Sequence, residues 1–376
     1  MKDFIDRQNK YVVYTVAAIA LLVLPILLQI AGNFWVRIAD IALLYVLLAL
    51  GLNIVVGYAG LLDLGYVAFF AIGAYMYALL SSPHLTDNFP WIAAHFPDGL
   101  HMPLWIAIPA GAALAGVLGV LLGAPTLKLR GDYLAIVTLG FGEIIRVFMN
   151  NLDQPVNVTN GPKGIGQIDS IHVFRFKFLG IPGIDLGERH DVFDFTISQV
   201  TNYYYLFLVL VVLSVFICHR LELSRIGRAW MAIREDEIAA KAMGINTRNM
   251  KLLAFGMGAT FGGVSGAMFA AFQSFVSPES FSLTESIMIV AMVVLGGIGH
   301  LPGVVLGAVL LSVLPEALRW VSGAFDLQAV SGGRLDASIL RQLLIALAMI
   351  IVMLLRPRGL WPTPEHGKSP AQQPAK

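Results

Sequence analysis

The sequence predicts an all-α polytopic membrane protein. Of its 376 residues, 57% are apolar and only 13% are charged, whereas a soluble domain is about 25% charged. The mean hydropathy is +0.75, and apolar runs close to the roughly 20 residues that cross a bilayer recur along the chain. We therefore expect residues 1–376 to form a single transmembrane domain of about ten transmembrane or re-entrant helices.

Ten apolar segments define the expected helices. Two of them, 62–81 and 284–299, are short or interrupted and rich in glycine. Broken or re-entrant helices are tolerated in a membrane only where protein or a water-filled cavity satisfies the freed backbone groups. The ten segments are 11–31, 34–56, 62–81, 103–124, 132–150, 202–219, 252–273, 284–299, 303–320 and 339–355.

Basic residues orient this arrangement, because cytoplasmic loops carry an excess of Lys and Arg. With ten spans both termini share one side, and that side holds 16 of the 25 Lys and Arg residues. We therefore expect cytoplasmic termini, a cytoplasmic tail at 356–376 and a cytoplasmic loop at 220–251. The loop 151–201 then lies outside. Its Gly-Pro pairs and the β-like run "IHVFRFKF" predict either a structured cap over the pore or a passive linker.

The motifs of soluble enzymes are missing. The sequence contains no G-x-x-x-x-G-K-[ST], H-E-x-x-H or G-x-S-x-G, and its eight histidines and single cysteine show no metal-ligand spacing. The net charge of +1 gives no sign of nucleic-acid binding. We therefore predict no catalytic residue, metal or cofactor, although a membrane active site built from distant residues stays open.

One segment concentrates charge in this poorly charged chain. "IGRAWMAIREDEIAAKAMGIN", residues 226–246, contains six charged side chains in 21 positions. Its apolar residues recur at helical spacing, which predicts one amphipathic helix with Ser224 as its N-cap and Gly244 at its end. The apolar stripe consists of Ile226, Trp230, Ile233, Ala240 and Met243. Such a helix either receives a partner protein or lies on lipid.

The stretch "REDEIAAKAMGIN" resembles the E-A-A-x-x-x-G coupling motif of ABC importer permeases, which docks on the ATPase subunit. Ala239, Ala240 and Gly244 match it, while Ile238 stands where the motif has Glu and Glu237 lies one residue early. The resemblance implies that this loop couples the permease to ATP hydrolysis. The residues implied are Arg228, Glu235, Asp236, Glu237, Ala239, Ala240, Met243 and Gly244.

Five further segments resemble the M-type branched-chain amino acid permeases, in the order of that family. They are "GLNIVVGYAGLLDLGYVAFFAIGAY", "LKLRGDYLAIVTLGFGEIIR", "TNGPKGI", "VVLGGIGHLPGVVLGA" and "LLRPRGL". The resemblance implies a bacterial inner-membrane importer with a second, H-type permease, two ATPase subunits and a periplasmic binding protein that delivers Leu, Ile or Val. Urea permeases share most of these patterns, so urea or another small amide or amino acid remains an alternative substrate.

Ionisable residues inside apolar segments are candidates for the substrate path, because each costs about 2.5–3.5 kcal/mol at a helix centre. Glu143 and Arg146 lie one turn apart and can form a structural ion pair, or Glu143 can line the outer vestibule. Asp63 lies between two leucines. It can meet the ammonium group of a zwitterion, or it can lie at a solvated loop edge.

Glycines at matching intervals suggest an internal repeat. Gly57, Gly60 and Gly65 are echoed by Gly296, Gly299 and Gly303. Such an echo suits two repeats with irregular backbone near a translocation path, and small-residue helix packing produces it as well.

Two other classes of function stay open. A secondary carrier driven by an ion gradient would explain the ionisable residues but not the charged cytoplasmic segment. A membrane enzyme would depend on Glu143, Asp63 or His300, and no motif supports it.

Overall fold

Among the residues described by the computed structural model, four helices are long and apolar enough to cross a membrane. They are Asn33–Tyr58, Leu104–Thr126, Val200–Leu223 and Thr247–Gln273. Shorter apolar helices span Ile19–Ile30, Val67–Leu80, Leu283–Gly296 and Leu301–Ala317. The structure describes residues 16, 19–30, 32–96, 100–127, 129, 131–169, 171–172, 196–197, 199–324, 343, 346–347, 350, 354 and 359–361.

The described elements are almost entirely helical, in agreement with the expected all-α class. In chain order they are α2 (Asn33–Leu52), η1 (Asn53–Tyr58), α3 (Val67–Leu80), α4 (His84–Asn88), α5 (Pro90–His95), α6 (Leu104–Thr126), α7 (Asp132–Asn151), η2 (Gly161–Lys163), β1 (Ile171–His172), β2 (Thr196–Ile197), α8 (Val200–Leu223), α9 (Arg225–Glu235), α10 (Glu237–Ala242), α11 (Thr247–Gln273), η4 (Pro278–Phe281), α12 (Leu283–Gly296) and α13 (Leu301–Ala324).

The predicted segments agree with these helices except near their ends. The segment 34–56 corresponds to α2 continued by the π-helix η1. The segment 62–81 is broken, because helix α3 begins only at Val67. Only Ile19–Ile30 and Val16 of the predicted first span, and only isolated residues of 339–355, are described. The rest of both predictions lies outside the described residues.

Glycine allows the central helices to approach closely. A Cβ added at Gly73 of α3 would overlap the backbone of Gly263 in α11, and one at Gly111 of α6 would lie 3.3 Å from the carbonyl oxygen of Gly73. Small residues at these positions bring the three backbones into contact, which is how helices associate without a hydrophobic driving force in lipid. Helix α11 therefore packs directly against both α3 and α6.

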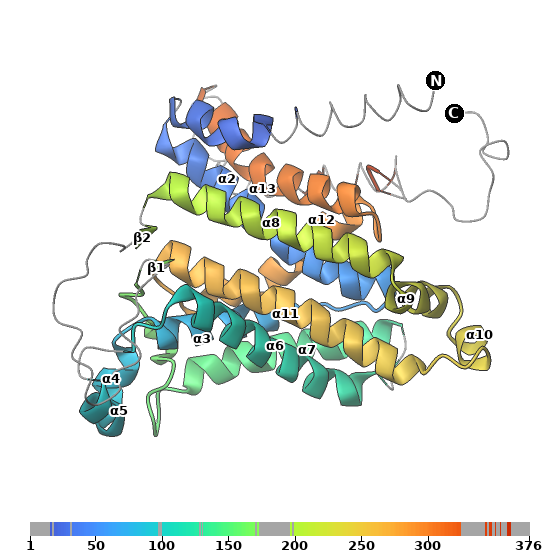
Figure 1. Cartoon of the computed structure of the whole chain (residues 1–376), viewed down its shortest axis with the longest axis horizontal. Helices are drawn as coiled ribbons and strands as arrows, with labels where there is room; N and C mark the ends of the chain where they lie inside the picture. The colour runs from blue at the N-terminus through green and yellow to red at the C-terminus, as the bar shows by residue number, and fades with distance from the viewer. Residues whose placement is uncertain are drawn as a thin grey trace, which may run out of the picture.

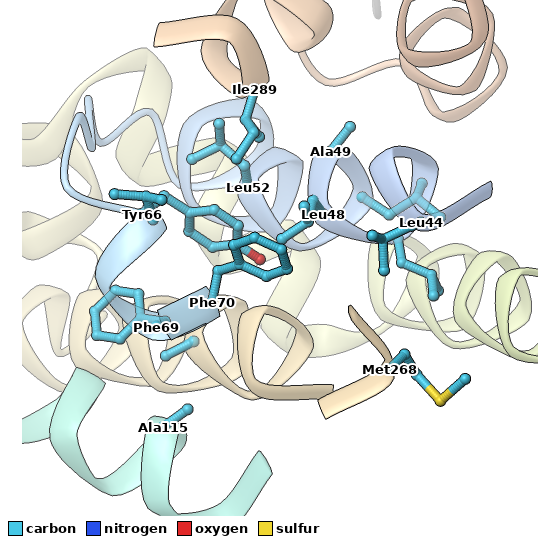
Figure 2. Packing of buried hydrophobic residues seen from close by; sticks show 14 of the residues in the cluster. Leu44, Leu48, Ala49, Leu52, Tyr66, Phe69, Phe70, Ala115, Met268 and Ile289 are labelled. Carbon is cyan, nitrogen blue, oxygen red and sulfur yellow. The ribbon is translucent and has the colours of Figure 1, made fainter. Parts of the chain in front are cut away.

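Aromatic side chains fill the space between α2 and α11. Figure 2 shows Tyr66, Phe69 and Phe70, which lie at and just after the start of α3, near Leu48 and Leu52 of α2. These residues are almost completely buried, and the hydroxyl of Tyr66 donates a hydrogen bond of 3.0 Å to the carbonyl oxygen of Gly258 in α11. The start of α3 is thereby held to α11 by packing and by a polar contact.

The long helices run side by side, and different elements occupy their two ends (Figure 1). Helices α9 and α10 lie at one end, and α4, α5, β1 and β2 lie at the other. Only the first two residues of the β-like run belong to a described strand, β1, which pairs antiparallel with β2. The predicted loops 220–251 and 151–201 therefore lie at opposite ends of the bundle, as far as the described residues show.

The described part of 151–201 is anchored on the bundle. Ile165 and Val276 exchange two backbone hydrogen bonds, of 2.8 and 2.9 Å, and the amide of Asp169 donates to the carbonyl oxygen of Ser81 at 2.8 Å. Residues 170, 173–195 and 198 of the predicted cap lie outside the described residues.

Candidate functional site

The charged segment folds as two short helices, not as the single helix expected. Ser224 caps α9, and its hydroxyl oxygen accepts a hydrogen bond of 3.1 Å from the amide of Gly227. Asp236 is extended, with φ −152° and ψ 110°, and its carboxylate accepts hydrogen bonds from the amides of Ile238 and Ala239 at 2.8 and 3.0 Å. Because Asp236 caps a new helix, it ends the first one. A predicted coupling residue thus has a clear structural role.

The break at Asp236 changes which residues face the bundle. Trp230, Ile233 and Ala240 of the apolar stripe are buried, whereas Met243 is 83% exposed. The stripe is therefore not continuous, because one extended residue shifts the helical phase of everything after it. Gly244 has φ +85° and follows α10, so its expected left-handed conformation is confirmed.

Helices α9 and α10 are fixed to the start of α11. The indole nitrogen of Trp230 donates a hydrogen bond of 2.7 Å to the carbonyl oxygen of Met250. Glu237 forms a 2.7 Å ion pair with Lys251, whose side chain is only 8% exposed. A buried cation requires such a partner. The two helices and α11 therefore form one packed unit.

Apolar side chains are exposed on α10 and directly after it, beside the exposed Lys241. We call the apolar residues Ile238, Ala239, Ala242 and Met243 the α10 tip. Ile238 and Met243 are 72% and 83% exposed. The neighbouring Glu235 is exposed, and so is Arg228, whose guanidinium contacts only the carbonyl oxygen of Leu223, at 3.5 Å. A small apolar surface with a charged rim is typical of a protein docking site.

Arg234 connects α9 to the turn at the end of η1, and the sequence analysis did not single it out. Its guanidinium donates a hydrogen bond of 2.5 Å to the carbonyl oxygen of Gly57. A Cβ added at Gly60 would lie 2.8 Å from Arg234 Cγ, and one at Gly299 would lie 2.7 Å from its Nη1. The arginine therefore occupies a space that only glycines leave. Its position four residues after the buried Trp230 was the signal in the sequence, since such residues share a helix face.

The two glycine segments meet beside Arg234. The amide of Gly299 donates a hydrogen bond of 2.9 Å to Asn53 Oδ1, and a Cβ at Gly57 would lie 2.9 Å from the amide nitrogen of Gly299. Gly60 and Gly299 have positive φ, +69° and +83°. Both segments therefore have irregular backbone, which is one of the two interpretations left open by their echo.

Small-residue packing, the other interpretation, applies to Gly296 and Gly303. A Cβ on either one would overlap the backbone of the other, so these glycines bring α12 and α13 into contact. The described residues of the predicted tail pack here as well, because the amides of Leu360 and Trp361 donate to the carbonyl oxygens of Leu295 and Gly296, at 2.8 and 3.2 Å. The six glycines thus serve two structural purposes.

Asp63 lies in the irregular stretch that returns from η1 to α3. It is 1% exposed, so the prediction of a solvated loop edge was wrong. One carboxylate oxygen accepts a hydrogen bond of 2.9 Å from the amide of Gly65. The hydroxyl of Thr138 accepts one of 3.0 Å from the amide of Leu64, and Ser286 donates one of 2.5 Å to the carbonyl oxygen of Leu64. Side chains thus satisfy backbone groups that a bilayer cannot.

The space beside Asp63 is small. A hollow of about 10 Å³ lies next to Asp63, Gly65 and Thr138, and a single water molecule needs roughly 10–15 Å³. A Cβ on Gly65 would overlap the backbone of Thr138 in α7. In this conformation the stretch with Asp63 and Gly65 packs closely against α7. No amino acid fits against the carboxylate.

Glu143 takes part in the predicted ion pair. Arg146 Nε lies 3.1 Å from Glu143 Oε2, and Arg146 Nη1 lies 3.2 Å from Glu279 Oε1 in η4. Arg146 therefore joins α7 to η4, and the pairing prediction is confirmed. The separate prediction that Glu143 lines an outer vestibule stays a prediction.

The part of the chain that the structure describes contains no group of three His, Cys, Asp or Glu side chains able to hold a metal ion. We call the contact between the two glycine segments beside Arg234 the glycine junction. Its polar side chains, Asn53 and Arg234, form hydrogen bonds with backbone groups. These side chains therefore hold the two backbone segments in place.

The comparisons with known proteins are consistent with this geometry. The family model described as "Branched-chain amino acid transport system / permease component" matches residues 34–354. The high-affinity branched-chain amino acid transport system permease protein LivM of Escherichia coli K12 is 40% identical over 91% of this chain and 74% of its own length. LivH of Salmonella typhimurium, from the system of the same name, is 25% identical over 86% of this chain and 93% of its own length. No solved structure matches the chain significantly.

Proposed function

Because the chain belongs to the branched-chain amino acid transport system permease family, we propose that it is a permease subunit of an ATP-driven importer for leucine, isoleucine and valine. ATP is hydrolysed by separate subunits, and this chain is not itself an enzyme. Relatives named LivM and LivH both align along most of this chain, which supports pairing with a second, LivH-like permease. A periplasmic binding protein supplies the substrate in this proposal.

The proposed location is the bacterial inner membrane, with both termini in the cytoplasm. The sequence assigns 16 of the 25 Lys and Arg residues to the side of the predicted loop 220–251, and this excess supports the orientation. The α10 tip is then directed toward the cytoplasm, where an ATPase subunit is available. Lipid surrounds the outer surfaces of α6 and α8, whose apolar windows are only 33% and 28% buried.

The link from the α10 tip to Gly57 is the observation that carries this proposal. The tip is rigidly connected to α9 and α11 through Trp230 and the Glu237–Lys251 pair. Arg234 extends that connection to Gly57 at the end of the first long span. A partner that moves the tip therefore moves the junction where the two glycine segments meet. This is the mechanical property that a coupling loop requires.

The test is a purification of the tagged chain from its native membrane in mild detergent. We expect a second permease and ATPase subunits with phosphate-binding loops to co-purify, with measurable ATP hydrolysis. Met243→Glu should remove the ATPase subunits because it places a charge on the α10 tip. Val156→Glu is the matched control, since Val156 is an exposed apolar residue, 49% accessible, in the predicted loop 151–201.

If the chain were recovered intact but without partner subunits, an ABC importer would be excluded and a carrier driven by an ion gradient would be favoured. Equal ATPase recovery with Met243→Glu and Val156→Glu would place the coupling contact elsewhere.

A further inference from the structure

A cavity of about 210 Å³ lies between α2, α3, α11, η4 and α12. It is far larger than the roughly 10–15 Å³ that one water molecule needs. Its apolar walls include Leu44, Phe70, Phe269 and Phe272. The rings of Phe70 and Phe269 lie 5.2 Å apart and form one continuous aromatic surface. Leu44 and Phe70 are seen from close by in Figure 2.

The cavity also has a polar side. Glu285, Tyr45, Gln273 and Ser280 complete its lining. The hydroxyl of Tyr45 donates a hydrogen bond to Glu285 Oε1, and no described residue donates to Glu285 Oε2. Gln273 Oε1 accepts a hydrogen bond of 2.7 Å from Arg37, which leaves the amide nitrogen of Gln273 as a donor. A carboxylate and two neutral donors therefore border an apolar space.

This combination matches a zwitterion with an aliphatic side chain. The Glu285 carboxylate attracts an ammonium group, and the Gln273 amide and Ser280 hydroxyl can donate to a carboxylate. The cation of Arg37 is hydrogen-bonded to the side-chain oxygen of Gln273. The leucine, aromatic and isoleucine walls accept a branched side chain, and such walls with a few convergent polar groups are typical of small-molecule sites. An uncharged amide such as urea has no ammonium group to meet the Glu285 carboxylate and no aliphatic side chain to contact the apolar wall.

A purely structural role for Glu285 explains less. The hydrogen bond from Tyr45 joins α2 to α12, and the amide oxygen of a glutamine can accept a hydrogen bond in the same place. An ionisable residue inside an apolar segment costs about 2.5–3.5 kcal/mol at a helix centre and less near its end. Glu285 occupies the first turn of the apolar helix α12. The hydrogen bond between α2 and α12 therefore does not require the negative charge of Glu285.

The position of the cavity suits an entry site. Gln273 is the last residue of α11, and Glu285 lies in the first turn of α12. Both helix ends lie at the end of the bundle away from α9 and α10 (Figure 1). In the proposed orientation this is the external end. We propose that the cavity is the outer binding site for the translocated amino acid, with Glu285 contacting its ammonium group; this rests on the proposed function.

The first experiment measures access to the cavity in the complete importer. Cys218 is the single cysteine of the chain and is buried, so Cys218→Ser provides a background without thiols in this subunit. Ser280→Cys then places one thiol in the cavity lining. In proteoliposomes with ATP and the binding protein, we expect L-leucine to slow its modification by a cationic methanethiosulfonate at least 3-fold. An unchanged rate would overturn the proposed site.

The second experiment separates charge from structure. Glu285→Gln should lower L-leucine uptake at least 10-fold, with normal assembly and ATP hydrolysis, because it keeps the Tyr45 acceptor and loses the charge. Glu316→Gln is the control, since this carboxylate pairs with Arg319 in α13 and does not line the cavity. Uptake by Glu285→Gln equal to that of Glu316→Gln would refute the inference.

The two levels of the proposal fail differently. If the unmodified importer shows no ATP-driven leucine uptake, the proposed function fails, and the cavity assignment fails with it. If it imports leucine while Glu285→Gln is normal and Ser280→Cys is unprotected, only the cavity assignment fails. Loss of assembly in Glu285→Gln would leave the decision to the Ser280→Cys protection, which does not alter Glu285.

Discussion

Arg234→Ala should uncouple ATP hydrolysis from transport. The substitution removes the only side chain described as donating to the carbonyl oxygen of Gly57. A hydrogen bond from a charged donor is worth about 1.5–3 kcal/mol. Arg234 is exposed, so water partly replaces it and the loss lies at or below the lower limit of that range. A loss of about 1–1.5 kcal/mol corresponds to a factor of about 5–10 in an equilibrium.

The assay compares two rates in the same proteoliposomes. Leucine uptake per ATP hydrolysed should fall by about 5–10-fold, because the state in which α9 holds the glycine junction is less populated. The rate of ATP hydrolysis should persist, since the α10 tip is unchanged. Arg225→Ala is the matched control, an exposed arginine at the start of the same helix that is not among the predicted coupling residues.

If Arg234→Ala and Arg225→Ala gave the same uptake per ATP, the Gly57 contact would not transmit the movement of α9. Arg234→Lys adds a graded test, because lysine keeps the charge but lacks the planar fork of arginine. It should fall between the wild type and Arg234→Ala.

Two further predictions concern stability, and the buried thiol of Cys218 reports unfolding in both through its reaction with a fluorogenic dye. Gly57→Ala should lower the unfolding midpoint by a few degrees, since overpacking costs about 1–3 kcal/mol where a Cβ would meet Asn53 and the amide of Gly299. Gly140→Ala should leave it unchanged or raise it, because nothing lies within 4 Å of the added atom; equal shifts would contradict this account of the junction. Trp230→Ala should cost about 3–5 kcal/mol and expose residues 235–246 to protease, and an unchanged cleavage rate would show that Trp230 does not hold α9.

Helix positions could be predicted from the sequence because length and hydropathy alone limit what crosses a membrane. The segment 202–219 lies within Val200–Leu223, and 252–273 lies within Thr247–Gln273. The start of α3 could not be predicted in the same way. Residues 62–66 were included in the predicted apolar segment, but their backbone groups bind the side chains of Asp63, Thr138 and Ser286 instead of forming a helix. Only tertiary contacts decide that choice.

The candidate site was predictable in its location and less so in its details. The caps at Ser224 and Gly244 depend on local chemistry, and the structure has both. The break at Asp236 depends on an equally local signal, an acidic cap with two amides to satisfy, which the charge pattern obscured. Tyr45 and Glu285 lie 240 positions apart. No periodicity in either segment predicts that they meet.

Helix α2 and its continuation η1 connect the two proposed sites. Tyr45, in the outer half of this element, joins Glu285 at the cavity, and Gly57, at its other end, joins Arg234. Gly299, at the far end of the α12 hairpin, meets Asn53 of the same element. Because α2–η1 contacts α12 through Tyr45 and the turn after α12 through Asn53, we expect a displacement of α9 that releases Gly57 to loosen the pair that also borders the cavity. The link between ATP hydrolysis and substrate release in this chain is therefore expected to pass through the relative position of these two helices.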